Sequence, residues 1–415
     1  MTDQILNQVL LNANSRSREG INAWLKGWGG KGLAIALEEP DAVIPLIRDA
    51  KLLGLGGSGF PAYIKWQDVA DNKAEKKYLI CNGNEDEPGT FKDRVLIQET
   101  PYQLIEGATI TAIACGISHV IFYINPHLKN CIQVMTDALS QWQASEIYIA
   151  MLKRLNMELS YSIVESSGYY IGGEETAVIE TIEGRFPFPK GKPPYPSENG
   201  LYNSPTIINN IETLCHVPHI IRNGAQWFKD LGQGEASGTK LYTLSGDILS
   251  PGVYELPMGV QLSELINDYG KGLLPGQSLK AIFTGGPSNS MLTDKDIDVR
   301  LDFESLINRG ASLGTGAMII ISNSTNVVKH VSEYVDFFSA GSCGQCPSCK
   351  TGTYYLSQLI SKIYYEKGAG SDLDQIEDLC RLLPGSGKCH LVDGAVKLVN
   401  SSLEHFRNDY EDLLI

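Results

Sequence analysis

Three cysteines lie within seven residues in the C-terminal part of the 415-residue chain, in the stretch GSCGQCPSCKTGT. They are Cys343, Cys346 and Cys349, and their C-x2-C-x2-C spacing on a glycine-containing turn places three thiolates around one small volume. Such an arrangement is typical of three corners of a cubane iron-sulfur cluster. Structural zinc more often uses two separate cysteine pairs. The spacing therefore predicts a 4Fe–4S cluster whose fourth ligand comes from elsewhere in the chain.

Two downstream cysteines compete for the fourth position. Cys389 follows Pro384, Gly385 and Gly387, in a loop whose backbone can bend close to an inorganic core. Cys380 lies in SDLDQIEDLCRLL, where apolar residues recur at helical spacing, which predicts a core residue. We therefore predict Cys389 as the ligand; a zinc site that uses His390 remains the alternative. The other isolated cysteines are expected to be packing residues: Cys81, Cys115, Cys131 and Cys215.

A glycine-rich loop, KLLGLGGSGFPAYIKW, occupies residues 51–66. Glycines at positions 54, 56, 57 and 59 let the backbone approach a phosphate or a flat ring that side chains would block. No clear strand leads into the loop and Pro61 interrupts the stretch after it, so the Rossmann fingerprint is not met. A merely flexible loop is the alternative.

An acidic cluster follows a predicted strand in KYLICNGNEDEPGTFKDR, residues 77–94. The apolar run Tyr78–Cys81 predicts a buried strand, and ligands of open α/β sheets bind at the carboxyl ends of strands. A solvated charged surface is the alternative, but the Pro-Gly turn that closes the cluster favours a ligand-binding site. The cluster consists of Asn82, Asn84, Glu85, Asp86 and Glu87.

Two further segments place polar side chains next to apolar stretches. In GYYIGGEETAVIETIEG, Glu174 and Glu175 begin a predicted helix, where helix capping explains carboxylates as well as ligand binding does. In SPTIINNIETL, the adjacent amides of Asn209 and Asn210 can donate to and accept from the edge of a heterocycle.

The elements that must position these groups fall into three predicted parts. Residues 1–240 alternate short strands, such as HVIFYI and SYSIVE, with helical stretches, which indicates an α/β domain. Residues 241–328 contain several strands around the helical stretch QLSELINDYG. Residues 329–415 show helical periodicity, which predicts a small helical bundle with the cysteines at one end.

Composition limits the partners and the compartment. The net charge is −14, with no basic arm, which argues against nucleic acid and anionic lipid. The stretch MTDQILNQVLL lacks the features of an export signal, and no run of eighteen apolar residues occurs, so no direct membrane insertion is expected. Nine cysteines in so long a chain do not form a disulfide framework, which favours a reducing, cytoplasmic location, peripheral at most to a membrane complex.

These motifs together resemble the NADH-oxidising flavoprotein family, the 51 kDa or F subunit of respiratory complex I and its relatives in NAD-reducing hydrogenases and formate dehydrogenases. GLGGSGFPAYIKW is similar to the family pattern GRGGAGFPTGxKW, and CNGNEDEPGTFKDR to CNADExEPGTFKDR. YIGGEETAVIETIEG, the KPPYP and NSPTIINNIETL segments and SCGQCPSC followed by Cys389 also match. The resemblance implies a Rossmann-like FMN/NADH-binding domain, a small β-grasp domain and a helical bundle that carries the cluster.

The resemblance also implies roles for individual residues. Glu87 and Glu175 would lie at the catalytic site and orient the dinucleotide rather than transfer protons. The cluster ligands would be Cys343, Cys346, Cys349 and Cys389. Cofactor-binding residues would be Gly54, Gly56, Gly57, Phe60, Lys65, Asn82, Asn84, Glu85, Tyr170, Gly173, Glu174, Lys192, Tyr195, Asn209 and Asn210. Among them Phe60 and Tyr195 would lie near the adenine, and an acidic lining favours NAD over NADP.

The implied activity is hydride transfer between NAD(H) and FMN, followed by one-electron transfer through the cluster. The electrons would pass to partners, a 2Fe–2S thioredoxin-like subunit and a larger iron-sulfur subunit. Four positions depart from the family pattern: Leu55, Asn84, Gly172 and the pair Ala62-Tyr63. They leave two alternatives open, a paralogue in a soluble, electron-bifurcating complex and an electron relay or scaffold that has lost NAD binding.

Overall fold

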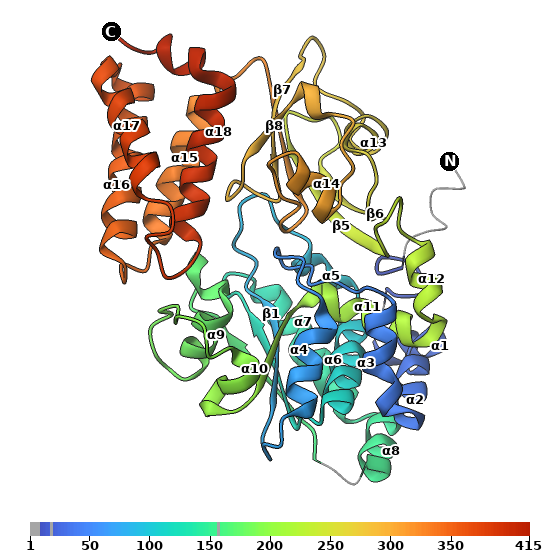
Figure 1. Ribbon diagram of the computed structural model, residues 1–415. Coiled ribbons are helices and arrows are strands. Elements are labelled where there is room, and N and C mark those ends of the chain that lie inside the picture. Colours follow the sequence, from blue (N-terminus) through green and yellow to red (C-terminus); the bar gives the residue numbers. More distant parts are fainter. Residues whose placement is uncertain (1–8, 17–19, 156–157) are drawn as a thin grey trace.

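The computed structural model describes residues 9–16, 20–155 and 158–415. Figure 1 shows three groups of elements, with a second sheet and a C-terminal helical bundle side by side at one end of a larger α/β part. The start of the chain, in which we found no export signal, lies largely outside the described residues. None of the described helices is long and apolar enough to cross a membrane.

A four-stranded parallel sheet forms the centre of the α/β part. Its strands are β1 (Tyr78–Gly83), β2 (His119–Ile124), β3 (Ser160–Glu165) and β4 (Thr206–Asn210), in the order β3-β2-β1-β4. This is the order of the first four strands of doubly wound dinucleotide-binding folds. Because all the strands are parallel, their carboxyl ends meet at one edge of the sheet, and β1 and β4 both end in asparagines there, Asn82 and Asn210.

Helices cover both faces of this sheet. The central one is α6 (Pro101–Cys115), which is apolar along nearly its whole length and almost completely buried. It packs on α11 (Ile211–Asn223) so closely that a Cβ at Gly107 would lie 2.9 Å from the carbonyl carbon of Leu214. The others are α1 (Ile21–Lys26), α2 (Lys31–Glu38), α3 (Pro40–Asp49), α4 (Ala62–Asp71), α5 (Asp93–Glu99), α7 (Lys129–Gln143), α8 (Glu146–Leu155), α9 (Glu175–Ile182), α10 (Pro196–Asn199) and α12 (Ala225–Asp230).

The second sheet is mixed and has its own apolar core. It contains β5 (Thr239–Gly246), β6 (Gly252–Pro257), β7 (Leu279–Thr284), β8 (Met291–Thr293) and β9 (Ala317–Ser322), in the order β6-β5-β9-β7-β8. Strands β5 and β9 are parallel, and the remaining pairs are antiparallel. The helical stretch predicted at QLSELINDYG forms the short helix α13 (Leu262–Glu264) followed by a π-helical turn, and α14 (Phe303–Asn308) follows later.

Four helices at the C-terminus pack around a third core. They are α15 (Val327–Gly341), α16 (Pro347–Ser361), α17 (Gly370–Leu382) and α18 (Leu391–Glu411). Cys346 is the N-cap of α16, and Cys389 immediately precedes the N-cap of α18, so the cysteine motif lies at helix starts. Cys380, on α17, is buried in the core of the bundle, as its helical spacing predicted. The isolated cysteines of the α/β part are buried as well.

The coarse prediction of a mixed α/β protein is confirmed: a parallel sheet flanked by helices is joined to a second sheet. The predicted strands HVIFYI and SYSIVE are β2 and β3. The glycine-rich loop, as expected, does not follow a strand of the sheet; it runs from the end of α3 to the start of α4 and is closed by a single bridge between Leu53 and Pro61.

Candidate functional site

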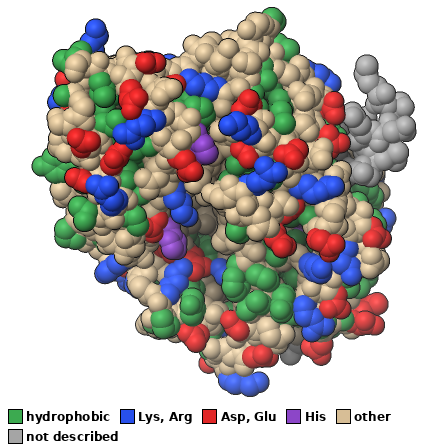
Figure 2. Space-filling view, turned by 45° about the horizontal axis from the view of Figure 1, so that its top comes forward, with side chains coloured by type: hydrophobic (Ala, Val, Ile, Leu, Met, Phe, Trp, Pro, Cys, Tyr) green, Lys and Arg blue, Asp and Glu red, His purple; other side chains and the backbone are tan. Residues whose placement is uncertain are grey.

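A cavity of about 580 Å³ lies where the three groups of elements meet. Figure 2 shows the surface hollowed at the centre of this face, with acidic and basic side chains around the hollow. The cavity brings together many of the residues that the sequence singled out: Gly56, Gly57, Asn82, Asn84, Glu85, Glu87, Tyr170, Gly173, Glu174, Asn210 and Cys389.

The glycine-rich loop supplies one wall through its backbone. At Gly57, φ is 144° and a Cβ would meet nothing within 4 Å, so the backbone there borders open space. At Gly56, a Cβ would lie 2.9 Å from Cβ of Asn210, so glycine allows the loop to lie against the end of β4. Gly54 donates its N–H to the carbonyl of Phe60 at 2.8 Å and closes the loop, but it does not line the cavity.

The acidic cluster after β1 is buried rather than solvated. The Glu85 side chain is completely buried and accepts hydrogen bonds from the N–H of Asp93 at 2.5 Å and from Nε of Arg94 at 2.7 Å. Burial, and then the neighbouring Asp93, raise the pKa of Glu85 to about 7, although Arg94 opposes the shift. A charged stretch whose side chains turn into the protein in this way is typical of a binding site, which argues against the alternative of a solvated charged surface.

Glu87 is held from two directions. The hydroxyl of Tyr170 donates to Oε2 at 2.6 Å, and the backbone N–H of Ser288, in the loop after β7, donates to Oε1 at 3.1 Å. Burial raises the pKa of Glu87, and both hydrogen bonds oppose that rise because they stabilise the charged form. Asn82 likewise reaches across the cavity wall and donates to the carbonyl of Gly173 at 2.9 Å.

The two glutamates at the start of α9 have different environments. Glu174 is the N-cap and accepts from the N–H groups of Thr176 at 2.8 Å and Ala177 at 3.1 Å, so the capping alternative is confirmed. It also lines the cavity, so capping and ligand contact do not exclude each other. Glu175 points elsewhere and lies between Nζ of Lys65, at 2.7 Å, and Nζ of Lys192. Burial alone would raise the pKa of Glu175, but these two lysines lower it.

Of the residues predicted to be catalytic or cofactor-binding, seven do not line the cavity. Phe60 and Tyr195 are exposed by 42% and 54%, and both lie on the glutamate–lysine side of the site. Asn209 is buried, and its Oδ1 accepts from Nε1 of Trp66 at 2.7 Å. The full set is Gly54, Phe60, Lys65, Glu175, Lys192, Tyr195 and Asn209. The structure thus separates a cavity group from an adjacent group built on Lys65, Glu175 and Lys192.

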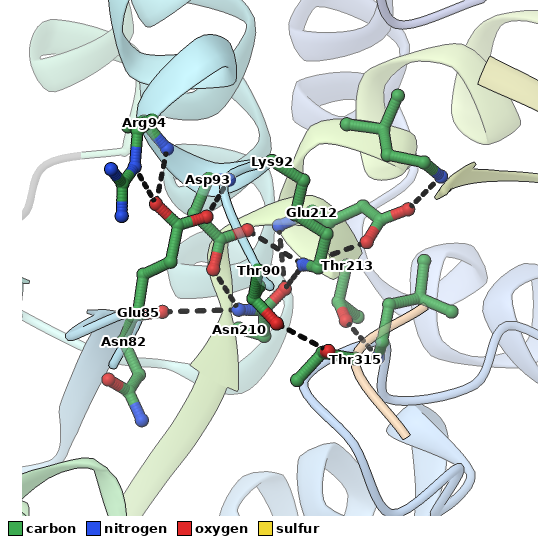
Figure 3. Close-up of polar contacts among 12 residues, drawn as sticks. Asn82, Glu85, Thr90, Lys92, Asp93, Arg94, Asn210, Glu212, Thr213 and Thr315 are labelled. Atoms are coloured by element: carbon green, nitrogen blue, oxygen red, sulfur yellow. Dashed lines mark hydrogen bonds and ion pairs between the residues drawn. The ribbon is translucent and has the colours of Figure 1, made fainter. Parts of the chain in front are cut away.

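A buried ionic network that the sequence did not reveal supports the cavity from behind (Figure 3). Nζ of Lys92 lies 2.8 Å from Oδ1 of Asp93 and 2.8 Å from Oε2 of Glu212, and it donates to Oδ1 of Asn210 at 3.1 Å. Asn210 in turn donates to Oδ2 of Asp93 at 2.7 Å. On the far side, Nζ of Lys240 lies 2.9 Å from Oε2 of Glu212. The Asn210 amide is therefore fixed at the cavity wall.

The charges of this network balance. Burial would raise the pKa of Glu212, but Lys240 and Lys92 lower it to about 2. Burial lowers the pKa of Lys240 to about 8, with Glu212 opposing, while the carboxylates around Lys92 raise its pKa despite burial. Two cations and two anions, Asp93 included, thus share one buried volume, which is tolerable only because each is paired.

The second sheet and α18 also contribute cavity residues that the sequence did not indicate. Only the paired glycines in FTGGPSNS, directly after a strand, could have drawn attention to the loop after β7. Thr315, in the loop before β9, bonds to Thr90 with 2.6 Å between the hydroxyl oxygens, which ties the second sheet to the acidic loop. The additional residues include Gly285, Ser288, Asn289, Ser312, Gly314, Thr315, Asp393 and Lys397.

The cysteine motif lies against the same cavity. Cys389 lines it, and burial followed by the nearby thiols of Cys349 and Cys343 raises the pKa of Cys389 to about 11. Burial raises the pKa of the Cys349 thiol, and the thiols of Cys343 and Cys346 add to that rise. The N–H of Lys388 also donates to Sγ of Cys346 at 3.3 Å, the kind of bond that stabilises cluster sulfur. The donor set therefore fits an iron-sulfur cluster.

The zinc alternative finds no support in this geometry. Within residues 9–16, 20–155 and 158–415, no three side chains of His, Cys, Asp or Glu converge as the ligands of a single ion would. The side chain of His390 is fully exposed and faces Asp393, with Nδ1 3.4 Å from Oδ2.

Comparison with known proteins decides the family. Residues 47–219 match the family model described as the Nuo51 FMN-binding domain, and residues 329–413 match the NADH-ubiquinone oxidoreductase-F iron-sulfur binding region. The chain is 38% identical to the NADH-quinone oxidoreductase F 2 subunit of Rhizobium meliloti over 97% of this chain and 96% of that protein. It belongs to the family of NADH-quinone oxidoreductase F subunits.

Other relatives agree with this membership. The F subunit of NADH-quinone oxidoreductase from Escherichia coli is 33% identical over 93% of this chain and 87% of that protein. Among solved structures, an NAD⁺-reducing [NiFe]-hydrogenase in the H2-reduced state has a TM-score of 0.83 and 32% identity; the match covers 92% of this chain and 64% of the hydrogenase chain. As a family member, the chain is an oxidoreductase subunit with FMN and 4Fe–4S cofactors, and it takes part in electron transfer from NADH.

The departures from the family pattern lie mostly away from the cavity. Leu55 is buried, with its N–H bonded to Oγ1 of Thr213 at 2.8 Å. Gly172 packs against the hydroxyl of Ser167, which would have to move to admit a larger side chain. Of these departures, only Asn84 lines the cavity, and its Oδ1 is buried without a hydrogen-bond partner. The substitutions therefore leave the cavity itself largely intact, which weakens the alternative of a relay that has lost NAD binding.

Proposed function

We propose that the cavity holds FMN and admits NAD(H), and that Cys343, Cys346, Cys349 and Cys389 hold the 4Fe–4S cluster beside it. One observation carries this proposal: a single cavity is lined both by the polar strand ends of the parallel sheet and by Cys389. A flavin in that cavity would lie next to the cluster, as electron transfer requires. When bound, FMN supplies the conversion of a two-electron donor into one-electron steps.

The cavity group would hold the flavin. Gly57 offers open backbone next to a ring or a phosphate, and Gly56 lets the loop lie close against Asn210. The Asn210 amide, fixed by Lys92 and Asp93, offers a preorganised polar contact, and the unpartnered Oδ1 of Asn84 lies in the same wall. The remaining contacts would come from Asn82, Glu85, Tyr170, Gly173 and Glu174. Gly54 and Asn209 do not line the cavity and would support this wall rather than touch the ligand. Gly54 closes the glycine-rich loop, and Asn209 bonds to Trp66.

The adjacent group would hold the dinucleotide, together with Glu87. Lys65 and Lys192 bracket Glu175 and present two cations to a pyrophosphate. The exposed rings of Phe60 and Tyr195 are available to stack on an adenine. Glu87 and Glu175 would orient the dinucleotide, since hydride transfer needs neither a protein acid nor a base. The acidic surroundings disfavour a 2′-phosphate, which supports NAD over NADP.

The finer division of the chain follows the three cores. Residues 1–240 would form the Rossmann-like FMN and NADH domain, residues 241–328 a β-grasp domain and residues 329–415 the cluster domain. One large group of buried apolar residues lies almost entirely within residues 1–240 and a second within residues 241–328, which supports the first two parts. A third group joins the helical bundle to one face of the second sheet, so the bundle packs directly on that sheet.

The electron path requires partners. Because no third redox centre is indicated in the chain, electrons would leave the cluster for a 2Fe–2S thioredoxin-like subunit and a larger iron-sulfur subunit. We place the assembly in the cytoplasm, peripheral to a membrane complex. The names of the relatives, subunits of NADH-quinone oxidoreductase, support membership of a multi-subunit complex.

Two cysteine variants test the placement of the cluster. Cys389→Ala should lose most of its iron after anaerobic reconstitution, whereas Cys380→Ala should keep it, because Cys380 is a buried residue of the bundle core. Both variants should retain FMN, and NADH should bleach that flavin in both. Full iron in Cys389→Ala, or a wild-type flavin that NADH does not bleach, would contradict the proposal.

A further inference from the structure

The segment between the two matched family regions, residues 220–328, has no functional region assigned to it by either match. It nevertheless builds part of the cavity. Two of its loops line the cavity, one after β7 with Gly285, Ser288 and Asn289, and one before β9 with Ser312, Gly314 and Thr315. The second sheet is therefore part of the site and not only an attachment to it.

The loop after β7 fixes the carboxylate of Glu87. The backbone N–H of Ser288 donates to Oε1 at 3.1 Å, and the hydroxyl of Tyr170 donates to Oε2 at 2.6 Å. Each carboxylate oxygen thus has one donor, and the two donors come from different parts of the chain. A partly buried side chain with both carboxylate oxygens engaged is held in a single orientation.

Gly286 makes this contact possible. Its φ is 94°, and a Cβ there would lie 2.8 Å from Cδ of Glu87 and closer still to Cγ and Oε1. The Glu87 side chain fills the space that any other residue at position 286 would need. A methyl group added at position 286 would push the carboxylate end of Glu87 aside, because that end is the flexible part of the contact.

The same loop is anchored on its other side. A Cβ at Gly394 in α18 would lie 3.1 Å from the carbonyl oxygen of Ser288, so the loop lies directly against the helix that follows Cys389. The N–H of Met291, at the start of β8, donates to Oγ of Ser401 in α18 at 3.1 Å. The loop is therefore wedged between Glu87 and the C-terminal bundle.

We propose that the loop at residues 285–289 of the second sheet is a positioning element of the NAD(H) site, and that Gly286 and the Ser288 N–H set the orientation in which Glu87 meets the dinucleotide. The inference rests on the proposed function, in which Glu87 contacts NAD(H). It assigns a role in substrate positioning to a part of the chain outside both matched regions.

The experiment compares Gly286→Ala with Gly276→Ala in the holoprotein. Both glycines lie in the second sheet's region with positive φ, 94° and 80°, so both alanines strain the backbone similarly, but a Cβ at Gly276 meets nothing within 4 Å. With ferricyanide as acceptor, Gly286→Ala should raise KM for NADH about tenfold, as expected for a displaced positioning group. FMN affinity and iron content should stay at wild-type values, and Gly276→Ala should match the wild type throughout.

A double-mutant cycle separates positioning from a general structural effect. In a Glu87→Ala background the clash is gone, so adding Gly286→Ala should cause no further loss in the second-order rate of flavin bleaching by NADH. Equal losses with and without Glu87, or KM values for Gly286→Ala equal to those for Gly276→Ala, would overturn the inference while leaving the proposed function intact. A wild-type flavin that NADH fails to bleach would overturn both.

Discussion

Buried charge dominates the site at the scale of single residues. The side chains of five charged residues are buried in the cavity wall or directly behind it, and hydrogen bonds or ion pairs satisfy them: Glu85, Asp93, Glu212, Lys92 and Lys240. Glu87 is partly buried in the same wall. Leaving one such charge unpaired costs several kcal/mol, so the network restricts which side chains the wall can carry. Glu85 is the member whose pKa lies closest to neutral pH.

Glu85 gives a prediction about pH. Burial, and then Asp93, raise its pKa in the folded protein to about 7, against a reference value of 4.5. The folded state therefore binds more protons than the unfolded state between these values, so the contribution of Glu85 to stability is full below pH 4.5 and is lost as the pH rises through about 7. Denaturation of the protein at pH 5 and pH 8 should show Glu85→Gln gaining roughly 1–3 kcal/mol relative to the wild type at the higher pH.

Asp298→Asn is the matching control. The Asp298 side chain is 69% exposed and forms an ion pair with Arg309. Its effect on stability should be small and should not vary over that range. A Glu85→Gln effect that is equally independent of pH would show that the carboxyl of Glu85 titrates normally in the folded protein.

Residue types and spacing in the sequence predicted the motifs well, but they predicted the contacts between side chains less well. The cysteine spacing, the glycine loop and the strand-end polar cluster could be read locally, because each lies within a short stretch of chain. Asn209 and Asn210 were indistinguishable in the sequence, and only the direction of each side chain at the end of β4 sends one to Trp66 and the other to the cavity. Lys92 and Lys240 escaped notice because the partner that they share, Glu212, lies far from both along the chain.

At the scale of elements, close helix packing behind the sheet fixes the carboxyl ends of the strands. Helix α6 crosses α11 at Gly107, and α11 begins directly after Asn210. Any displacement of α11 would move the Asn210 amide and Glu212, its first-turn residue, which bonds Lys92 and Lys240. The packing of two buried helices therefore determines the position of a cavity side chain.

Gly107→Ala tests this packing. The new Cβ would overlap the carbonyl group of Leu214, which is backbone and cannot rotate away. We expect a loss of roughly 3 kcal/mol or more in stability, seen as a lower Tm, together with weaker FMN binding in fluorescence titrations. Gly370→Ala, at the start of α17 where a Cβ meets nothing within 4 Å, is the control and should behave as the wild type does. Unchanged Tm in Gly107→Ala would show that the two helices can separate freely.

Elements were predictable where apolar periodicity is strong. Most strands of both sheets and the C-terminal helices were predicted from apolar runs or helical spacing in the sequence, whereas β4 and the three-residue β8 were not identified as strands. The π-helical turns at Leu265–Tyr269 and Lys362–Glu366 were not predictable, because an extra residue in a helical turn leaves no local sequence signature. The placement of the second sheet over the cavity depends on contacts such as Thr90 with Thr315, which only the folded chain brings together.

At the scale of the whole molecule, three groups of elements close one cavity. The parallel sheet supplies the polar strand ends, the second sheet supplies two loops, and the helical bundle supplies Cys389 and the start of α18. Figure 1 shows why this is possible: the second sheet and the bundle lie side by side over the same end of the α/β part. The flavin and cluster sites that we propose would share a wall, which would allow electrons to cross within one chain before they reach a partner subunit.

The most direct test is an anaerobic titration of the reconstituted protein with NADH, followed by absorption for the flavin and by electron paramagnetic resonance for the cluster. The account predicts that NADH bleaches the flavin and that the signal of a reduced 4Fe–4S cluster appears in the same titration, while NADPH does much less of both. A flavin that bleaches while the cluster stays oxidised even with excess NADH would contradict the shared cavity as an electron path.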